Sequence, residues 1–295
     1  MLMVKNRLIR LPAVRLGLII LWLLAWTGAG LAADSAALPA KDWNLRQVEG
    51  LQAPKGGTLT FAVLGDSRSN PPVFERLLKD MAGDPSLTFA IDIGDMVERG
   101  TLEQFDEFFK QIRSAVRLPF LTVAGNHDLG KKQALTLYRE IFGPDYYAFQ
   151  LKDHYFIVLN NNLRTGMGEA QMAWLENELR NSRAFKTRLV FFHYPLFDPR
   201  GDKYHHSLPE EAGRRLAALF SRYQVTHIFT SHIHGYFTGK WDGVPFTLTG
   251  GGGAPLAGTD PDHYFYHYLK VTLQEGEVHV EVQRIKAAGD HYPYD

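Results

Sequence analysis

From Thr58 onward, short apolar runs alternate along the chain with segments whose apolar residues recur at helical spacing. Runs such as LTFAVL at 59–64 are typical of buried strands. The predicted strands cover 59–64, 87–93, 119–125, 146–151, 154–160, 187–193, 225–231, 243–253, 264–273 and 277–285. Between them, sets such as Leu102, Phe105, Phe109 and Ile112 predict amphipathic helices. This order predicts an α/β domain with strands in its middle and helices outside.

The composition is compatible with one large domain and excludes several kinds of chemistry. The chain has 295 residues, of which 45% are hydrophobic, so it can bury a large core. The formal net charge is zero, which gives no sign of nucleic-acid binding. The absence of cysteine excludes disulfides, thiolate metal ligands and a cysteine nucleophile.

The first 33 residues have the composition of an export signal. A basic stretch is followed by a run from 16 to 33 without any charged residue, and small residues around Ala33 match a cleavage region. We expect residues 1–33 to be a signal peptide or, if uncleaved, a membrane anchor at the lower limit for a bilayer span. In both cases we expect the remaining chain to be exported, with a periplasmic or extracellular location.

The remaining chain divides at a change in composition. Residues 34–57 contain LPAKDWN and APKGG, and we expect them to form a linker or lead-in arm. Residues 58–295 show no internal repeat and no further boundary, so we expect a single domain there.

Five of the predicted strands end in polar residues. In α/β folds ligands bind at the carboxyl ends of strands, and oxygen and imidazole donors suit Mn, Fe and Zn ions. A single aspartate there is usually a turn residue or a helix cap, so only the combination predicts a metal site. The motifs are GDSR with Asp66, GDMVERG with Asp95, Glu98 and Arg99, GNHD with Asn126, His127 and Asp128, FFHYP with His193, and SHIHG with His232 and His234.

Taken together, these motifs resemble the calcineurin-like metallophosphoesterase family. Its pattern is D-x-H, G-D-x-x-x-x-G, G-N-H-D/E, a lone H and G-H-x-H, and the resemblance covers about residues 58–282. It implies a four-layer α-β-β-α sandwich with a dinuclear metal centre at the strand ends. It also implies a hydrolase that cleaves phosphomonoesters or phosphodiesters by attack of a metal-bound hydroxide.

The resemblance also assigns metal ligands by position. Asp95 would bridge two divalent transition-metal ions, which can be Mn, Fe or Zn. The other ligands would be Asp66 and His234 for the first ion, and Asn126, His193 and His232 for the second.

Further residues would act on the substrate or support the ligands. The resemblance places His127 at the leaving oxygen of the substrate, and Asp128 and Glu98 behind the ligands. GDMVERG is similar to a GDxVDRG motif of the phosphoprotein-phosphatase branch, in which the arginine grips phosphate. Arg99 is therefore a candidate phosphate contact, with an ordinary surface arginine as the equal alternative.

Two positions depart from the family pattern. Arg68 stands where the D-x-H histidine is expected, and a guanidinium cannot ligate a metal. We therefore expect the first ion to bind weakly and Arg68 to contact substrate phosphate through two N–H groups. The alternative is that Arg68 pairs with a nearby carboxylate and has no substrate role. Ser231 replaces a glycine, and we expect little consequence because serine is small.

The segment 194–209 follows His193 and is a candidate substrate-selecting loop, with Arg200, Lys203, His205 and His206. The glycines at 250–253 could bring backbone close to the site. Histidines that fit no ligand position are interpreted as structural or exposed: His154, His227, His263, His279 and His291.

Two other functions remain as alternatives. One is a non-catalytic phosphate-ligand-binding protein on the same fold, with a degraded first metal site. The other is a membrane-anchored scaffold. Retention of every other ligand position favours the enzyme. We expect its partner to be a small-molecule or macromolecular phosphoester substrate, and membrane contact only through an uncleaved N-terminal segment.

Overall fold

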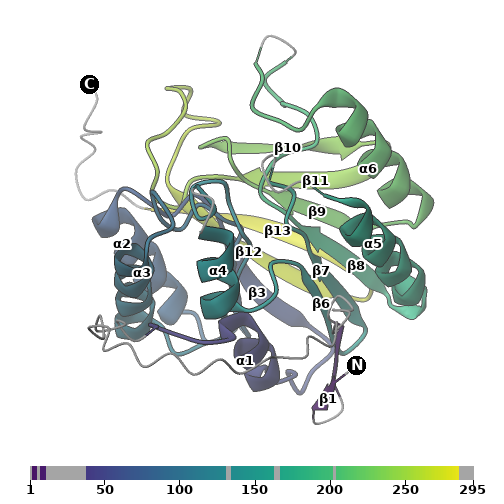
Figure 1. The fold of residues 1–295 in the computed structure, drawn as a ribbon, viewed down its shortest axis with the longest axis horizontal. Coiled ribbons are helices and arrows are strands. Elements are labelled where there is room, and N and C mark those ends of the chain that lie inside the picture. Colours follow the sequence, from purple (N-terminus) through teal and green to yellow (C-terminus); the bar gives the residue numbers. More distant parts are fainter. Residues whose placement is uncertain are drawn as a thin grey trace, which may run out of the picture.

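Two β-sheets lie face to face between two groups of helices (Figure 1). The computed structural model describes residues 2–4, 7–10, 38–130, 134–162, 167–201 and 204–285. The arrangement confirms the predicted four-layer α-β-β-α sandwich.

The first sheet has five strands and is covered by helices on its outer face (Figure 1). The strand order is β13 (Glu277–Arg284), β12 (His267–Gln274), β3 (Leu59–Leu64), β4 (Ala90–Asp92) and β5 (Phe120–Thr122). Strands β3, β4 and β5 run parallel, and β12 runs antiparallel to both of its neighbours. The covering helices are α2 (Pro71–Ala82), α3 (Leu102–Ala115) and α4 (Ala134–Phe142).

The second sheet has eight strands and carries two helices on its own outer face (Figure 1). The order is β1 (Leu2–Val4), β2 (Arg7–Arg10), β6 (Tyr147–Leu151), β7 (His154–Val158), β8 (Thr187–Phe191), β9 (His227–Thr230), β11 (Val244–Thr249) and β10 (Tyr236–Trp241). Strands β7, β8, β9 and β11 are parallel. The helices are α5 (Glu169–Asn181), followed by a 3₁₀ turn (Ser182–Ala184), and α6 (Glu210–Arg222).

Central strands are buried on both faces, which explains their continuous apolar sequences. In β3, Phe61 and Val63 pack into the core between the sheets, whereas Ala62 and Leu64 pack beneath the helices. The ring of Phe61 stacks on Phe89 with centroids 4.8 Å apart. Each strand thus contributes to two cores at once, and this fixes the ends of the strands relative to one another.

The predicted linker at 34–57 is corrected for part of its length. Residues 43–50 form helix α1 (Trp43–Gly50), and Val48 and Leu51 are buried in the core between the sheets. The side chain of Asn44 accepts the N–H of Thr122 at 2.8 Å and donates to the Thr122 hydroxyl at 3.1 Å. The helix was missed because so few of its side chains are buried that the apolar spacing is weak. It secures the end of β5, from which the GNHD loop starts.

The apolar stretch at 16–33 lies outside the described residues, so the predicted signal or anchor segment is described only at 2–4 and 7–10, which form β1 and β2. Within the part of the chain that the structure describes, none of the helices combines the length and the apolar character needed to cross a membrane.

If α1 belongs to the folded domain, Asn44→Ala should lower the free energy of unfolding by about 2 kcal/mol, because it leaves the buried Thr122 N–H without an acceptor. Urea unfolding followed by circular dichroism measures this change. The control Glu49→Ala alters an exposed side chain of the same helix and should shift stability by less than about 0.5 kcal/mol. Equal midpoints for Asn44→Ala and the wild type would contradict the assignment.

Candidate metal centre

The predicted ligands come from the carboxyl ends of strands in both sheets. Asp66 and Asp95 follow β3 and β4 of one sheet, and His193 and His232 follow β8 and β9 of the other. Asp66 Oδ2 accepts the backbone N–H of His232 at 2.9 Å, so the loops from the two sheets are in direct contact. The sandwich therefore brings residues that are distant in sequence to one place.

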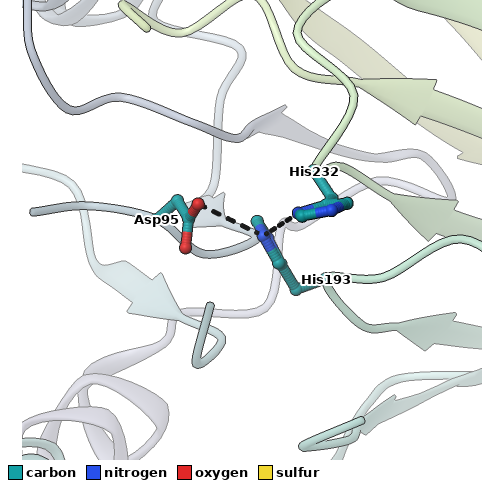
Figure 2. A group of neighbouring side chains, drawn as sticks. All are labelled: Asp95, His193 and His232. Carbon is teal, nitrogen blue, oxygen red and sulfur yellow. Dashed lines mark hydrogen bonds and ion pairs between the residues drawn. The ribbon is translucent and has the colours of Figure 1, made fainter. Parts of the chain in front are cut away.

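Three donor atoms surround Nε2 of the buried His193. Asn126 Oδ1 lies 3.1 Å away, His232 Nδ1 3.3 Å and Asp95 Oδ2 3.4 Å. Figure 2 shows the imidazole of His193 between Asp95 and His232. Atoms of these three residues lie within 4.8 Å of one another, close enough to hold one metal ion. Oxygen and imidazole nitrogen donors suit Mn, Fe and Zn, so this part of the site fits the predicted second ion.

The tautomer of His193 is set by a hydrogen bond at its second ring nitrogen, Nδ1. Nδ1 lies 3.0 Å from the carbonyl oxygen of Ile93, to which it donates its hydrogen, and Nε2 is left facing the cluster. Burial disfavours the imidazolium, but the Asp95 carboxylate raises the pKa of His193 to about 9. Burial, followed by the charge of His193, lowers the pKa of His232 to about 3. A metal that takes this place must displace the His193 proton, so its affinity should fall as the pH decreases.

Asp66 and His234 face each other beside this cluster. Asp66 Oδ1 is buried without a hydrogen-bond partner in the described residues and lies 3.4 Å from His234 Nε2. His234 Nδ1 lies 2.6 Å from the carbonyl oxygen of Pro255. Burial opposes ionisation of Asp66, but His234 outweighs it and lowers the pKa of Asp66. The same pairing overcomes burial at His234 and raises its pKa.

Three of the predicted ligands have strained backbones. Asp66, Asp95 and His232 have φ values of 57°, 59° and 71°, in the left-handed region of the backbone that residues other than glycine rarely adopt. Gly94, with φ 101°, has no room for a side chain, because a Cβ there would lie 2.8 Å from His193 Nδ1. Such strain persists only where the surrounding structure enforces it, and it is concentrated at functional sites.

Asp128 supports the two loops that carry Asp95 and Asn126, in the position predicted behind the ligands. Its carboxylate accepts the backbone N–H groups of Gly125 at 2.8 Å, Asp95 at 2.9 Å, Met96 at 3.0 Å and Val97 at 3.2 Å. Burial first, and then the Asp95 charge, raise the pKa of Asp128 to about 7.

Arg68 is placed beside the predicted first ion. Its Nη1 lies 2.9 Å from both carboxylate oxygens of Glu98, which is the pairing described by the alternative reading of Arg68. Its Nε lies 3.7 Å from Asp95 Oδ2, and only 12% of the side chain is exposed. Its contact with a substrate phosphate remains a prediction.

The other two predicted catalytic residues differ in their placement. His127 is a third exposed, at 33%, and its Nε2 lies 3.9 Å from Asp95 Oδ2. The Arg99 side chain is exposed, and no contact within the described ranges joins it to the cluster. His127 thus lies beside the candidate metal centre, whereas the contact of Arg99 with phosphate remains a prediction.

Three further residues lie next to the site: His206 of the predicted substrate-selecting loop, Tyr194 of the same segment, which was given no role of its own, and Ser231. The ring of Tyr194 lies against His232 with centroids 4.0 Å apart, and His206 lies 5.8 Å from the same ring. Ser231, expected to matter little, donates from its hydroxyl to Asp66 Oδ2 and lies 3.0 Å from the Thr249 carbonyl oxygen. A polar replacement of a motif glycine was the signal that could have identified Ser231.

Comparisons with known proteins agree with this geometry. A family model described as calcineurin-like phosphoesterase matches residues 59–236. The human serine/threonine-protein phosphatase CPPED1 is 26% identical over 214 residues, covering 66% of this chain and 66% of that protein. A probable cyclic nucleotide phosphodiesterase, RPA0124 of Rhodopseudomonas palustris, is 26% identical over 185 residues, covering 57% of this chain and 64% of that protein. The chain thus spans slightly less than two thirds of the length of these relatives.

A solved structure supports the fold. Purple acid phosphatase PPD1 from yellow lupin seeds superposes with a TM-score of 0.64 at 19% identity, covering 79% of this chain and 53% of that one.

Metal binding can be tested without measuring activity. Mn²⁺ at about 100 times its Kd should stabilise the wild type by about 2.7 kcal/mol, seen as a rise in Tm. His232→Ala should lose most of this rise because it removes a donor. His279→Ala, which changes an exposed histidine of β13, should keep it. An undiminished rise in His232→Ala would place the metal elsewhere.

Proposed function

The chain belongs to the calcineurin-like phosphoesterase family, and we propose that it is a metal-dependent phosphoesterase acting on phosphomonoesters or phosphodiesters. The observation that carries the proposal is the convergence of Asp95, Asn126 and His232 on Nε2 of His193. The names of the relatives, a protein phosphatase and a probable phosphodiesterase, support the same class of reaction.

A divalent ion in this cluster would supply Lewis acidity and would lower the pKa of a bound water. The protein's contribution is to hold the donors in place before substrate arrives. The Ile93 carbonyl orients His193, and the carboxylate of Asp128 holds the Asp95 backbone N–H at 2.9 Å. Among the donors, Asp95 carries a negative charge, and burial keeps His232 neutral. The donors therefore do not neutralise a divalent ion completely.

His127 is placed to act on the leaving oxygen. Its Nδ1 lies 2.9 Å from the carbonyl oxygen of Glu98, to which it donates, and its backbone N–H donates to Asp95 Oδ1 at 2.8 Å. These two contacts direct Nε2 towards the cluster from its partly exposed side. A protonated Nε2 there can give its hydrogen to the ester oxygen as the P–O bond breaks.

The proposal is tested by hydrolysis of p-nitrophenyl phosphate and bis-p-nitrophenyl phosphate during titration with Mn²⁺. We expect activity that saturates with metal. His127→Ala should lower kcat by about 10²-fold to 10⁴-fold, as expected for loss of a general acid. Its Mn²⁺-induced rise in Tm should be retained, because His127 is not a proposed ligand.

The control His279→Ala should have the activity of the wild type. Metal-loaded, folded protein that hydrolyses no ester in a broad panel of phosphoproteins, nucleotides and cyclic nucleotides would contradict the proposal. The non-catalytic phosphate-binding alternative would then be favoured.

A further inference from the structure

The guanidinium of Arg68 lies among the atoms that the family pattern assigns to the first metal ion. Its Nη2 is 3.5 Å from His234 Nε2, and its Nε is 3.7 Å from Asp95 Oδ2. We propose that this guanidinium permanently takes the place of the first ion. The chain then holds one divalent ion, bound by Asp95, Asn126, His193 and His232. The use of the guanidinium charge in catalysis rests on the proposed function, whereas the metal count does not.

Arg68 is fixed in this place by its own contacts. Nη1 lies 2.9 Å from each carboxylate oxygen of Glu98, and the Ser69 hydroxyl bonds the same carboxylate. The side chain is nearly buried, with 12% exposed. A buried guanidinium is stable only when it is paired, and here Glu98 and Asp95 supply negative charge on two sides. It is therefore held as a defined part of the site.

The residues at the first position do not fit a metal ion while Arg68 is there. An ion bound by Asp66, Asp95 and His234 would share the last two with a guanidinium that cannot lose its proton. Two positive groups would compete for the same donors, and water cannot screen them well in a buried site. Arg68 can only leave this place by breaking both contacts with Glu98.

The second position shares only Asp95 with the guanidinium. The donors around His193 Nε2 lie within 3.1–3.4 Å of it. Among the His, Asp and Glu side chains of the described residues, the group that converges closely enough for an ion is Asp95, His193 and His232. At the first position, Asp66 Oδ1 lies 3.4 Å from His234 Nε2, and the same nitrogen lies 3.5 Å from Arg68 Nη2. The guanidinium therefore lies next to the donors that an ion would need.

The arrangement has a chemical consequence for substrate. A guanidinium held next to a single ion supplies a second positive charge that does not depend on metal concentration. The Nε of Arg68 is buried and lies 3.7 Å from Asp95 Oδ2, so the guanidinium charge is held inside the site, beside the carboxylate that binds the ion. Arg68 would bind a phosphoryl oxygen that a second ion would otherwise bind.

The metal count tests the inference directly. Purified protein is dialysed against Mn²⁺, and the bound metal is measured by mass spectrometry of the digested sample. The wild type should bind one ion per chain, and its electron paramagnetic resonance spectrum should be that of an isolated Mn²⁺. Arg68→His should bind a second ion and give the spectrum of a coupled pair. Arg76→His makes the same change on the exposed surface of α2 and should stay at one ion.

Each outcome decides the inference. Two tightly bound ions in the wild type would overturn it, and so would a folded Arg68→His protein that still binds one. If Arg68→His does not fold by circular dichroism, the wild-type count and spectrum remain decisive. Arg68→Lys keeps the charge and should also bind one ion. One bound ion without phosphoester hydrolysis would contradict the proposed function while supporting the inference.

Discussion

A buried hydrogen bond between the two sheets determines the geometry of the metal centre. Nδ1 of His193, at the end of β8, donates to the carbonyl oxygen of Ile93, just after β4 of the other sheet. The bond fixes the imidazole tautomer and directs Nε2 towards Asp95, Asn126 and His232. Because the two ends belong to different sheets, the orientation of the ligand depends on how the sheets pack. The packing of the aromatic core between the sheets thus affects the orientation of a predicted metal ligand.

The packed layers also hold a site whose backbone is strained and whose Asp66 carboxylate is buried. Asp66, Asp95 and His232 have left-handed backbones, and Asp66 is fully buried. Such conformations cost of order 1–3 kcal/mol each and persist only where the surrounding structure enforces them. Hydrogen bonds from successive backbone N–H groups to the Asp128 carboxylate, and from the His232 N–H to Asp66, provide that enforcement. Three of the nine non-glycine residues with positive φ in the described chain are predicted ligands, as expected for a site arranged for binding before its ligand arrives.

Sequence alone predicted what depends on local pattern. The run at 59–64 coincides with β3, because a strand buried on both faces must be continuously apolar. The sandwich itself followed only from the family resemblance, since strand pairing across the chain leaves no local signal. Helix α1 was missed because so few of its side chains are buried. The pairing of Arg68 with Glu98, and the exposure of Arg99, depend on side-chain packing that a motif does not encode.

Diffraction from Mn²⁺-loaded crystals, collected at the manganese absorption edge, tests the central claim most directly. The account predicts one anomalous peak per chain, about 2.0–2.3 Å from His193 Nε2, with Asp95, Asn126 and His232 completing the ligands. It also predicts the Arg68 guanidinium, and no peak, between Asp95 and His234. A peak away from His193, or a second peak in the place of the guanidinium, would contradict it.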